Sequence, residues 1–109
     1  MNKVLKGEAF VKEIIEAAEL VIVQFKTEWN GGCQIMAPIY DELSKQFASK
    51  AKFFTIDTEV EQAIAKEYRI MELPTFLFFK DGELIDHVKG LLSKNLLALK
   101  IEEAIKWSE

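Results

Sequence analysis

The segment Glu28-Trp29-Asn30-Gly31-Gly32-Cys33-Gln34 joins an apolar run, Leu20 to Lys26, to a long helical pattern. It contains an aromatic residue, two glycines and the only cysteine of the chain. A junction between a strand and a helix collects free backbone N–H groups and the positive end of the helix dipole, and both favour a thiolate. We therefore expect any chemistry of this chain to lie at this junction.

The sequence before the junction predicts a strand, a helix and a second strand. Val4-Leu5 indicates a short edge strand, and apolar residues at three- and four-residue spacing predict an amphipathic helix over residues 8–19. Leu20 to Lys26 is apolar and rich in β-branched residues, as expected of a buried central strand. Alternation places Val21, Val23 and Phe25 on one face, and Leu20, Ile22, Gln24 and Lys26 on the other.

The sequence after the junction predicts a helix to about residue 49, a strand over residues 51–57 and a helix over residues 59–68 with Ala63, Ile64 and Tyr68 on its apolar side. Strands over residues 75–80 and 83–89 flank Asp81-Gly82, the turn signature of an antiparallel hairpin. Ser93 then caps a terminal helix. Its predicted inward stripe is Leu96, Leu97, Leu99, Lys100, Ile101, Ala104 and Ile105. We therefore predict one α/β domain over residues 1–109, with a central mixed sheet between helices.

The composition excludes several classes of function. The 109 residues are 50% hydrophobic and 29% charged, and the net charge is −4 with scattered lysines, so we expect no nucleic-acid partner. No run of about 18 apolar residues is present, so we expect no membrane partner and a cytoplasmic location. One cysteine allows no internal disulfide, and His87 stands without ligand-spaced neighbours, so we expect no metal and no cofactor.

Four landmarks, taken together in order and spacing, give the chain a resemblance to the thioredoxin family. They are Trp29-x-Gly31-x-Cys33, Ala37-Pro38, Leu73-Pro74-Thr75, and Lys80-Asp81-Gly82-Glu83 followed by Gly90. The resemblance implies the thioredoxin fold, with a C-terminal antiparallel hairpin and a terminal helix. It also implies a cis Pro74 and a shallow groove that binds an extended client peptide as an added strand. The implied groove residues are Trp29, Gly31, Gly32, Leu73, Pro74, Gly90 and Leu91.

The chain departs from the family at its two-cysteine site. Thioredoxins use a C-x-x-C pair, whose first thiol attacks a client disulfide and whose second resolves the mixed disulfide. Here Asn30 replaces the attacking cysteine and Cys33 occupies the resolving position, so the dithiol cycle cannot run. Asn30 can still accept a backbone hydrogen bond as a helix N-cap, which is worth about 0.5–2 kcal/mol relative to alanine.

Two further departures affect proton transfer. Gln24 stands where the family typically has a buried proton-transferring aspartate, and Phe53 stands where its lysine partner lies. Losing both members of a buried ion pair costs less than losing one, because neither charge is left unpaired. Lys26 stands where the family often has a second tryptophan, and a cation there lowers the pKa of Cys33.

Three functions remain compatible with these residues. The first is a redox protein in which Cys33 acts as a single thiol, with glutathione or another thiol resolving its mixed disulfides; the enzyme activity is then at most monothiol–disulfide exchange. The second is a redox-inactive module that binds peptides or proteins through Trp29 and the Leu73-Pro74 loop, with Cys33 as a small buried side chain. The third is a structural partner of a larger assembly. Family resemblance favours the first.

Overall fold

A five-stranded mixed sheet forms the centre of the protein, in a computed structural model that describes residues 2–109. The strand order is β1-β3-β2-β4-β5. Strands β1, β3 and β2 are mutually parallel, whereas β4 runs antiparallel to both β2 and β5. The bounds are β1 (Asn2–Val4), β2 (Leu20–Lys26), β3 (Lys52–Asp57), β4 (Thr75–Lys80) and β5 (Glu83–Lys89).

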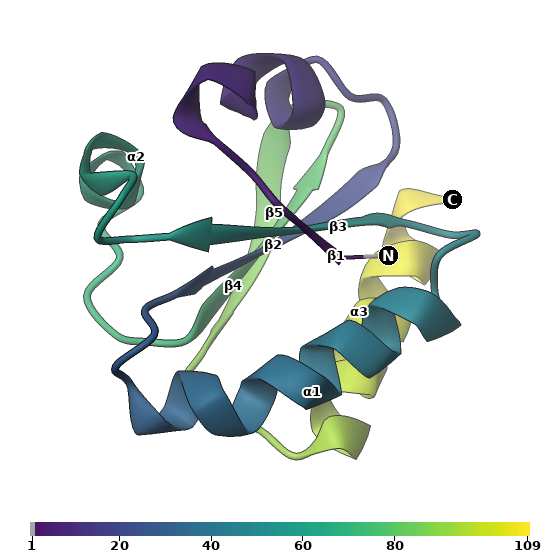
Figure 1. Ribbon diagram of the computed structural model, residues 1–109. Coiled ribbons are helices and arrows are strands. Elements are labelled where there is room, and N and C mark those ends of the chain that lie inside the picture. Colours follow the sequence, from purple (N-terminus) through teal and green to yellow (C-terminus); the bar gives the residue numbers. More distant parts are fainter. Residues whose placement is uncertain (1) are drawn as a thin grey trace.

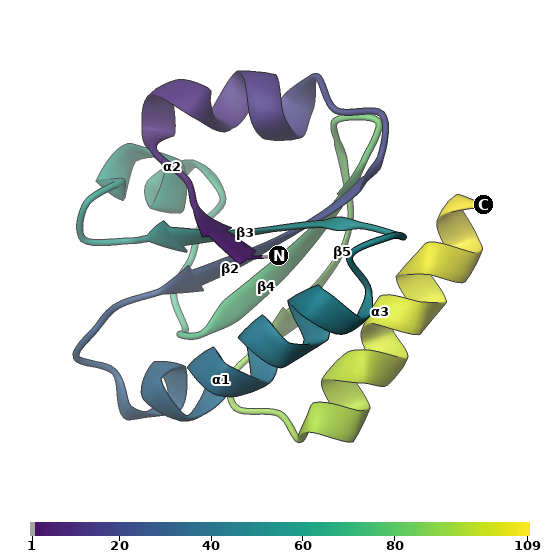
Figure 2. The same cartoon turned by 45° about the vertical axis from the view of Figure 1, so that its right-hand side comes forward.

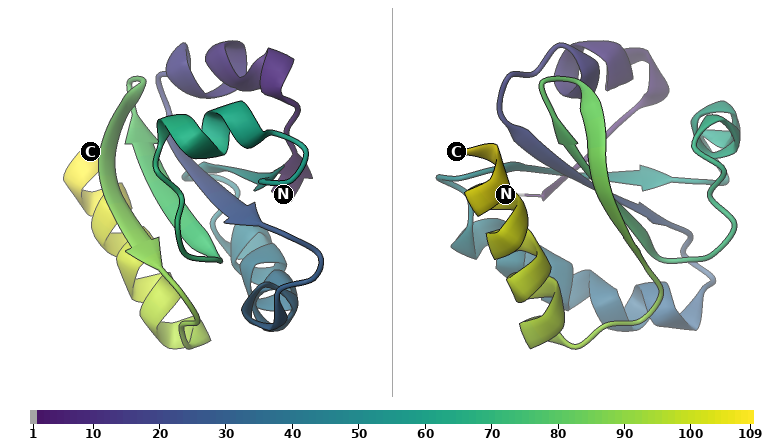
Figure 3. Two further views of the ribbon diagram at one scale, coloured as in Figure 1. Left: turned by 90° about the vertical axis from the view of Figure 1, so that its left-hand side faces the viewer. Right: turned by 180° about the vertical axis from the view of Figure 1, so that it is seen from behind.

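Helices cover both faces of this sheet (Figure 1). One face packs against α1 (Gly31–Gln46) and α3 (Lys94–Ser108). The opposite face packs against a 3₁₀-helix, η1 (Gly7–Ala9), a π-helix, η2 (Val11–Ile15), and α2 (Gln62–Glu67). Figure 2 and both views of Figure 3 show the same three layers. The predicted α/β architecture and the C-terminal hairpin and helix are confirmed.

Strand β2 divides the core as its alternation predicts. Val21, Val23 and Phe25 pack with the η2 side, whereas Leu20 and Ile22 pack with α1 and α3. Because both faces are covered, the strand is buried over almost its whole length. Its polar residue Gln24 is therefore buried as well, with 3% of its surface exposed.

Tyr40 fixes α1 over the centre of the sheet. Its hydroxyl group lies 2.7 Å from the carbonyl oxygen of Phe54 and 3.0 Å from that of Ile22, so it bridges β3 and β2. Burial raises the pKa of Tyr40 well above its ordinary value, so the hydroxyl remains a proton donor. This contact ties α1, and with it the helix start near the end of β2, to the two central strands.

The predicted helix over residues 8–19 is wrong in type and length. The structure has the short helices η1 and η2, and the second closes with a hydrogen bond from the Glu16 amide to the Val11 carbonyl. Of this segment only Phe10 and Ile14 are fully buried, and one helical turn suffices to bury them; Ala9, Ile15 and Ala17 pack partly buried against the core. Ala18 instead lies in the connection to β2, and its carbonyl accepts a hydrogen bond from Lys80 at 2.7 Å.

Smaller differences occur at the edges of other elements. Strand β1 starts two residues earlier than predicted, and α2 is shorter than the predicted helix and leaves Ala63 exposed. In α3, Leu96 and Leu99 are 45% and 51% exposed, so the inward stripe is narrower than predicted. The Ser93 cap is confirmed by a 3.1 Å hydrogen bond from the Leu96 amide.

Candidate functional site

The junction that opens α1 lies at the end of the sheet where β2 ends and the chain enters β4. Figures 1 and 3 show these two loops at the same end of the sheet. The second loop contains a cis peptide bond between Leu73 and Pro74. Gly32 touches this loop, since a Cβ atom built on it would lie 3.4 Å from Pro74 Cδ. The Gly90 amide donates a 2.7 Å hydrogen bond to the Pro74 carbonyl.

These contacts bring together four of the seven predicted groove residues: Gly32, Leu73, Pro74 and Gly90. Trp29 and Leu91 are exposed, with 79% and 57% of their surface accessible. Gly31 is also exposed, with open space around the position of a Cβ atom. Glu72 lies beside Gly90, so its carboxylate adds a negative charge next to these residues.

Asn30 is the N-cap of α1. Its backbone is extended, with φ −90° and ψ 123°, and its side-chain oxygen accepts a 2.9 Å hydrogen bond from the Cys33 amide. The first backbone hydrogen bond of the helix runs from the Gln34 amide to the Asn30 carbonyl at 3.0 Å. Asn30 therefore satisfies one of the free amides at the helix start and holds the backbone of Cys33 in place.

Cys33 lies beneath this cap, with 3% of its surface exposed. Burial raises the pKa of the Cys33 thiol above its ordinary value. A backbone hydrogen bond at Thr27 and the charge of Lys26 both lower the pKa, but they offset only part of the effect of burial. The folded protein thus holds Cys33 mainly as a neutral thiol at neutral pH.

The positive charge of Lys26 acts on two neighbouring groups, the Asp57 carboxylate and the Cys33 thiol. Its ammonium nitrogen lies 3.8 Å from the Asp57 carboxylate, to which it is also paired in the β2–β3 register. At this distance and partial exposure the ion pair is loose. The ammonium group therefore still acts on Cys33, in the direction that favours the thiolate.

Gln24 has an incomplete set of hydrogen bonds. Thr55 is its partner in the β2–β3 register, and the Thr55 hydroxyl lies 3.3 Å from Gln24 Oε1 and 2.7 Å from Asn2 Oδ1. A hydroxyl carries one proton, so the shorter contact to Asn2 is the stronger hydrogen bond. Gln24 Nε2 is buried and has no hydrogen-bond partner among residues 2–109.

Phe53, in β3, lies on the same face of the sheet as Gln24, but its side chain is part of the hydrophobic core. It is buried and packs edge-on against Tyr40, with ring centroids 5.8 Å apart. Its register partner is Ile22 rather than Gln24. The two positions that the resemblance assigns to a relay pair thus hold an amide and a core aromatic ring.

A cavity of about 340 Å³ connects the polar residues at this end of α1. It lies between α1 and the β1 edge of the sheet. The sequence analysis did not predict it, because no short motif encodes the pairing of β1 with β3. Its walls come from β1, β2, β3, the loop after β2 and α1. The lining residues are Asn2, Val4, Gln24, Lys26, Thr27, Glu28, Cys33, Gln34, Ala37 and Thr55.

The chain is similar to known proteins over most of its length. The family model described as thioredoxin matches residues 1–103. The chain belongs to the thioredoxin family. It is 38% identical to a thioredoxin of Rickettsia felis over 97 residues, which are 89% of this chain and 92% of that protein. It is 33% identical to thioredoxin 1 of Synechococcus elongatus over 94 residues, 86% and 88% of the two chains.

A plant relative extends the similarity. The chain is 37% identical to the chloroplastic thioredoxin Y1 of Arabidopsis thaliana over 99 residues, 91% of this chain, and it spans only 58% of the length of that relative. Thioredoxin family membership supports a thiol redox role in general terms and fits protein clients.

The described residues contain no candidate metal site and no candidate membrane-spanning helix. Within residues 2–109, no three His, Cys, Asp or Glu side chains gather closely enough to hold a metal ion. No helix in the same range is long and apolar enough to cross a bilayer.

Proposed function

We propose that this thioredoxin-family protein is a component of thiol redox homeostasis that works by single-thiol exchange through Cys33. The observation that carries the proposal is that Cys33, although buried beneath the Asn30 cap, forms part of the wall of a cavity that also contains Lys26. The thiol therefore has an approach from the side of α1. Lys26 lowers its pKa, as a thiolate nucleophile requires.

The exchange proceeds in two steps. The Cys33 thiolate attacks a disulfide and forms a mixed disulfide with one half of it, while the other half leaves as a thiol. A second thiol, glutathione or another small thiol, then attacks the mixed disulfide and regenerates Cys33, because Asn30 supplies no resolving sulfur. Since burial raises the pKa of Cys33, this exchange is slow at neutral pH and accelerates with rising pH.

Protein clients bind in the groove that Gly32, Leu73, Pro74 and Gly90 form, with exposed Trp29 and Leu91 as adjoining apolar contacts. An extended peptide can add its backbone to the loop at Leu73. A second candidate function uses only this groove, as a redox-inactive binding module. The burial of Cys33 and the direction of its pKa shift are the observations that favour it.

Mass spectrometry separates the two functions. The protein is purified without reductant and then treated with oxidised glutathione, with Cys33→Ser as the blank and the urea-unfolded chain as the positive control. A glutathione adduct or a disulfide-linked dimer on folded wild type, absent from Cys33→Ser, supports single-thiol exchange. A thiol that resists both oxidised glutathione and a small neutral disulfide when folded, and reacts with both when unfolded, supports the binding module instead.

A gain-of-function variant tests the loss of the dithiol cycle. Asn30→Cys restores a C-x-x-C pair, and we expect it to reduce insulin disulfides more slowly than a dithiol thioredoxin, because Gln24 cannot transfer protons. Asn30→Ser is the matched control, since it keeps a capping oxygen and adds no sulfur. Rates equal to those of a dithiol thioredoxin would show that Gln24 is irrelevant. Failure of the variant to form any disulfide would refute the assignment of Asn30 to the attacking position.

A further inference from the structure

The cavity beside Cys33 is lined by a hydrogen-bond donor that has no partner among residues 2–109, the side-chain amide of Gln24. Gln24 is 3% exposed, it lines the cavity, and its Nε2 atom has no partner within residues 2–109. A buried amide without a partner costs free energy, which a ligand with a hydrogen-bond acceptor recovers. This unsatisfied amide and the thiol share one cavity, so a single small molecule can contact both.

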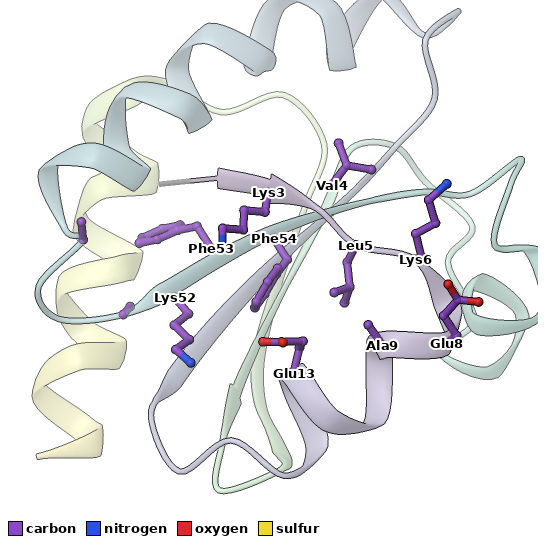
Figure 4. A pocket seen from close by; sticks show the side chains of 12 residues that line it. Lys3, Val4, Leu5, Lys6, Glu8, Ala9, Glu13, Lys52, Phe53 and Phe54 are labelled. Atoms are coloured by element: carbon purple, nitrogen blue, oxygen red, sulfur yellow. The ribbon is translucent and has the colours of Figure 1, made fainter.

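A second cavity of the protein lacks this combination. It has a volume of about 400 Å³ and lies between β1, the η helices and β3, as Figure 4 shows. It is lined by apolar side chains such as Leu5 and Phe54 and by ionic ones such as Lys52 and Glu13. Among the described residues, the only buried side-chain nitrogen or oxygen without a partner is Gln24 Nε2, so nothing in the larger cavity points to a ligand.

We propose that the cavity beside Cys33 binds a low-molecular-weight disulfide that carries a hydrogen-bond acceptor, with Gln24 Nε2 as the donor that holds it and Cys33 as the atom that attacks it. This inference rests on the proposed single-thiol function and specifies its substrate class. Ligand sites typically occupy about 300–1,000 Å³, so a volume of about 340 Å³ suits a small molecule rather than a length of peptide.

The charges of the lining favour a neutral ligand. Among the described residues that line the cavity, only Lys26 and Glu28 are charged, and their charges are opposite. A ligand with a net charge would gain from one and be repelled by the other. An uncharged disulfide with a hydroxyl or carbonyl group avoids this conflict and still satisfies Gln24.

The reaction balances without any further reactant. The Cys33 thiol releases its proton to water, and the thiolate attacks one sulfur atom of the ligand disulfide. A bond forms between Cys33 Sγ and that sulfur while the sulfur–sulfur bond of the ligand breaks. The electron pair leaves with the other sulfur, which takes a proton from water and becomes a thiol. Cys33 is oxidised, and half of the ligand is reduced.

The test compares two neutral disulfides of equal size, bis(2-hydroxyethyl) disulfide and dipropyl disulfide, which differ only in a hydroxyl group against a methyl group. The rate of mixed-disulfide formation at Cys33 is followed by mass spectrometry, and each rate is divided by the rate for the urea-unfolded chain. We expect folded wild type to favour the hydroxyl probe by about 2- to 10-fold, the value of one hydrogen bond. In Gln24→Met this preference disappears.

Two variants on α1 test whether the disulfide probes reach Cys33 through the cavity. Ala37 lines the cavity and is exposed, so Ala37→Phe narrows it and slows both probes. Ile35 is 56% exposed and outside the cavity lining, so Ile35→Phe adds the same ring to the same helix and leaves both rates unchanged.

Each contrary outcome has a defined meaning. A reactive Cys33 that shows the same probe preference in wild type and Gln24→Met overturns the cavity inference and leaves single-thiol exchange intact. Rates that fall no further in Ala37→Phe than in Ile35→Phe place entry outside the cavity and overturn the inference likewise. A folded Cys33 that reacts with neither probe, while the unfolded chain reacts with both, overturns the proposed function together with the inference.

Discussion

Replacing Gln24 with methionine is expected to stabilise the protein, although the residue is buried in the central strand. Gln24 Nε2 has no partner within residues 2–109, and leaving a buried donor unsatisfied costs about 1–3 kcal/mol. Methionine has nearly the same length and an apolar thioether in place of the amide, so it fills the same space without this cost. The substitution loses only the 3.3 Å contact between the Thr55 hydroxyl and Gln24 Oε1, because that hydroxyl keeps its 2.7 Å hydrogen bond to Asn2.

The net gain in the free energy of unfolding is about 1–2 kcal/mol, which for a chain of this length corresponds to a rise in Tm of about 4 °C for each kcal/mol. Urea unfolding followed by far-UV circular dichroism measures it, and an unchanged m-value shows that the exposed surface on unfolding is the same. Thr55→Val is the matched control. It removes the hydroxyl and leaves Asn2 and Gln24 without their shared partner, so we expect a loss of about 1 kcal/mol.

A loss of stability of more than about 1 kcal/mol in Gln24→Met, with an unchanged m-value, would refute this reasoning. It would mean that the amide of Gln24 is fully hydrogen-bonded in solution, through ordered water in the cavity. In that case Gln24 contributes to folding as a satisfied polar group, and the argument that it is held ready for a ligand loses its energetic basis.

Three further predictions concern the start of α1. Asn30→Ala removes the acceptor for the Cys33 amide and lowers the free energy of unfolding by about 0.5–2 kcal/mol, whereas Asn30→Asp keeps the acceptor and the stability; equal losses in both variants contradict a capping role. Gly31→Ala raises the free energy of unfolding by about 0.4–1 kcal/mol in urea titrations, because its Cβ meets open space and the unfolded chain loses freedom; a loss instead shows a left-handed or crowded backbone there. Burial raises the pKa of Cys33, so its rate of alkylation by iodoacetamide keeps rising at pH values where the rate for the unfolded chain has levelled off. A pH midpoint of this rate in the folded protein at or below that of the unfolded chain disproves the shift.

The same pKa shift sets a direction for stability. A thiol whose pKa is higher in the folded than in the unfolded chain binds its proton more tightly when folded. The resulting stability is fully present below the unfolded pKa and is lost as the pH rises through the folded pKa. Cys33→Ser removes this dependence, so the difference in stability between the two proteins narrows on the alkaline side.

Much of the fold could be predicted because local signals agreed with the tertiary packing. The bounds of β2, β4 and β5 are those the alternation and the turn predict, since the strands are strongly apolar and Asp81 and Gly82 adopt the positive φ angles that an Asp-Gly turn requires. The segment before β2 failed for the opposite reason. Its helical period continues to Ala18, but only Phe10 and Ile14 are fully buried, so the packing supports single helical turns rather than one long helix.

The sequence leaves open whether Cys33 is a reactive thiol or a small buried side chain, because its environment depends on distant segments. The lysine at position 26 indicates a lowered pKa when only the nearest charge is considered. The structure adds desolvation by the surrounding fold, and desolvation outweighs the charge. The hydrogen bond between Asn2 and Thr55, which leaves Gln24 with its weaker contact, joins residues 53 positions apart. No local pattern contains that pairing.

The distribution of polar groups argues that the junction is more than a stabilised remnant of a dithiol site. Loss of the attacking thiol frees the positions around it to become apolar, and an apolar cavity would cost less than one that contains an unsatisfied amide. The structure instead places Gln24, Thr55, Lys26 and the thiol of Cys33 around one space, next to helix α1. Binding sites carry this kind of energetic cost, because groups that are incompletely paired in the free protein are completed by a ligand. The stability of Gln24→Met and the probe preference of wild type therefore both test whether the cavity is a binding site. A binding site is expected to give a more stable Gln24→Met and a wild-type preference for the hydroxyl probe. An unused cavity is expected to give the gain in stability without the preference.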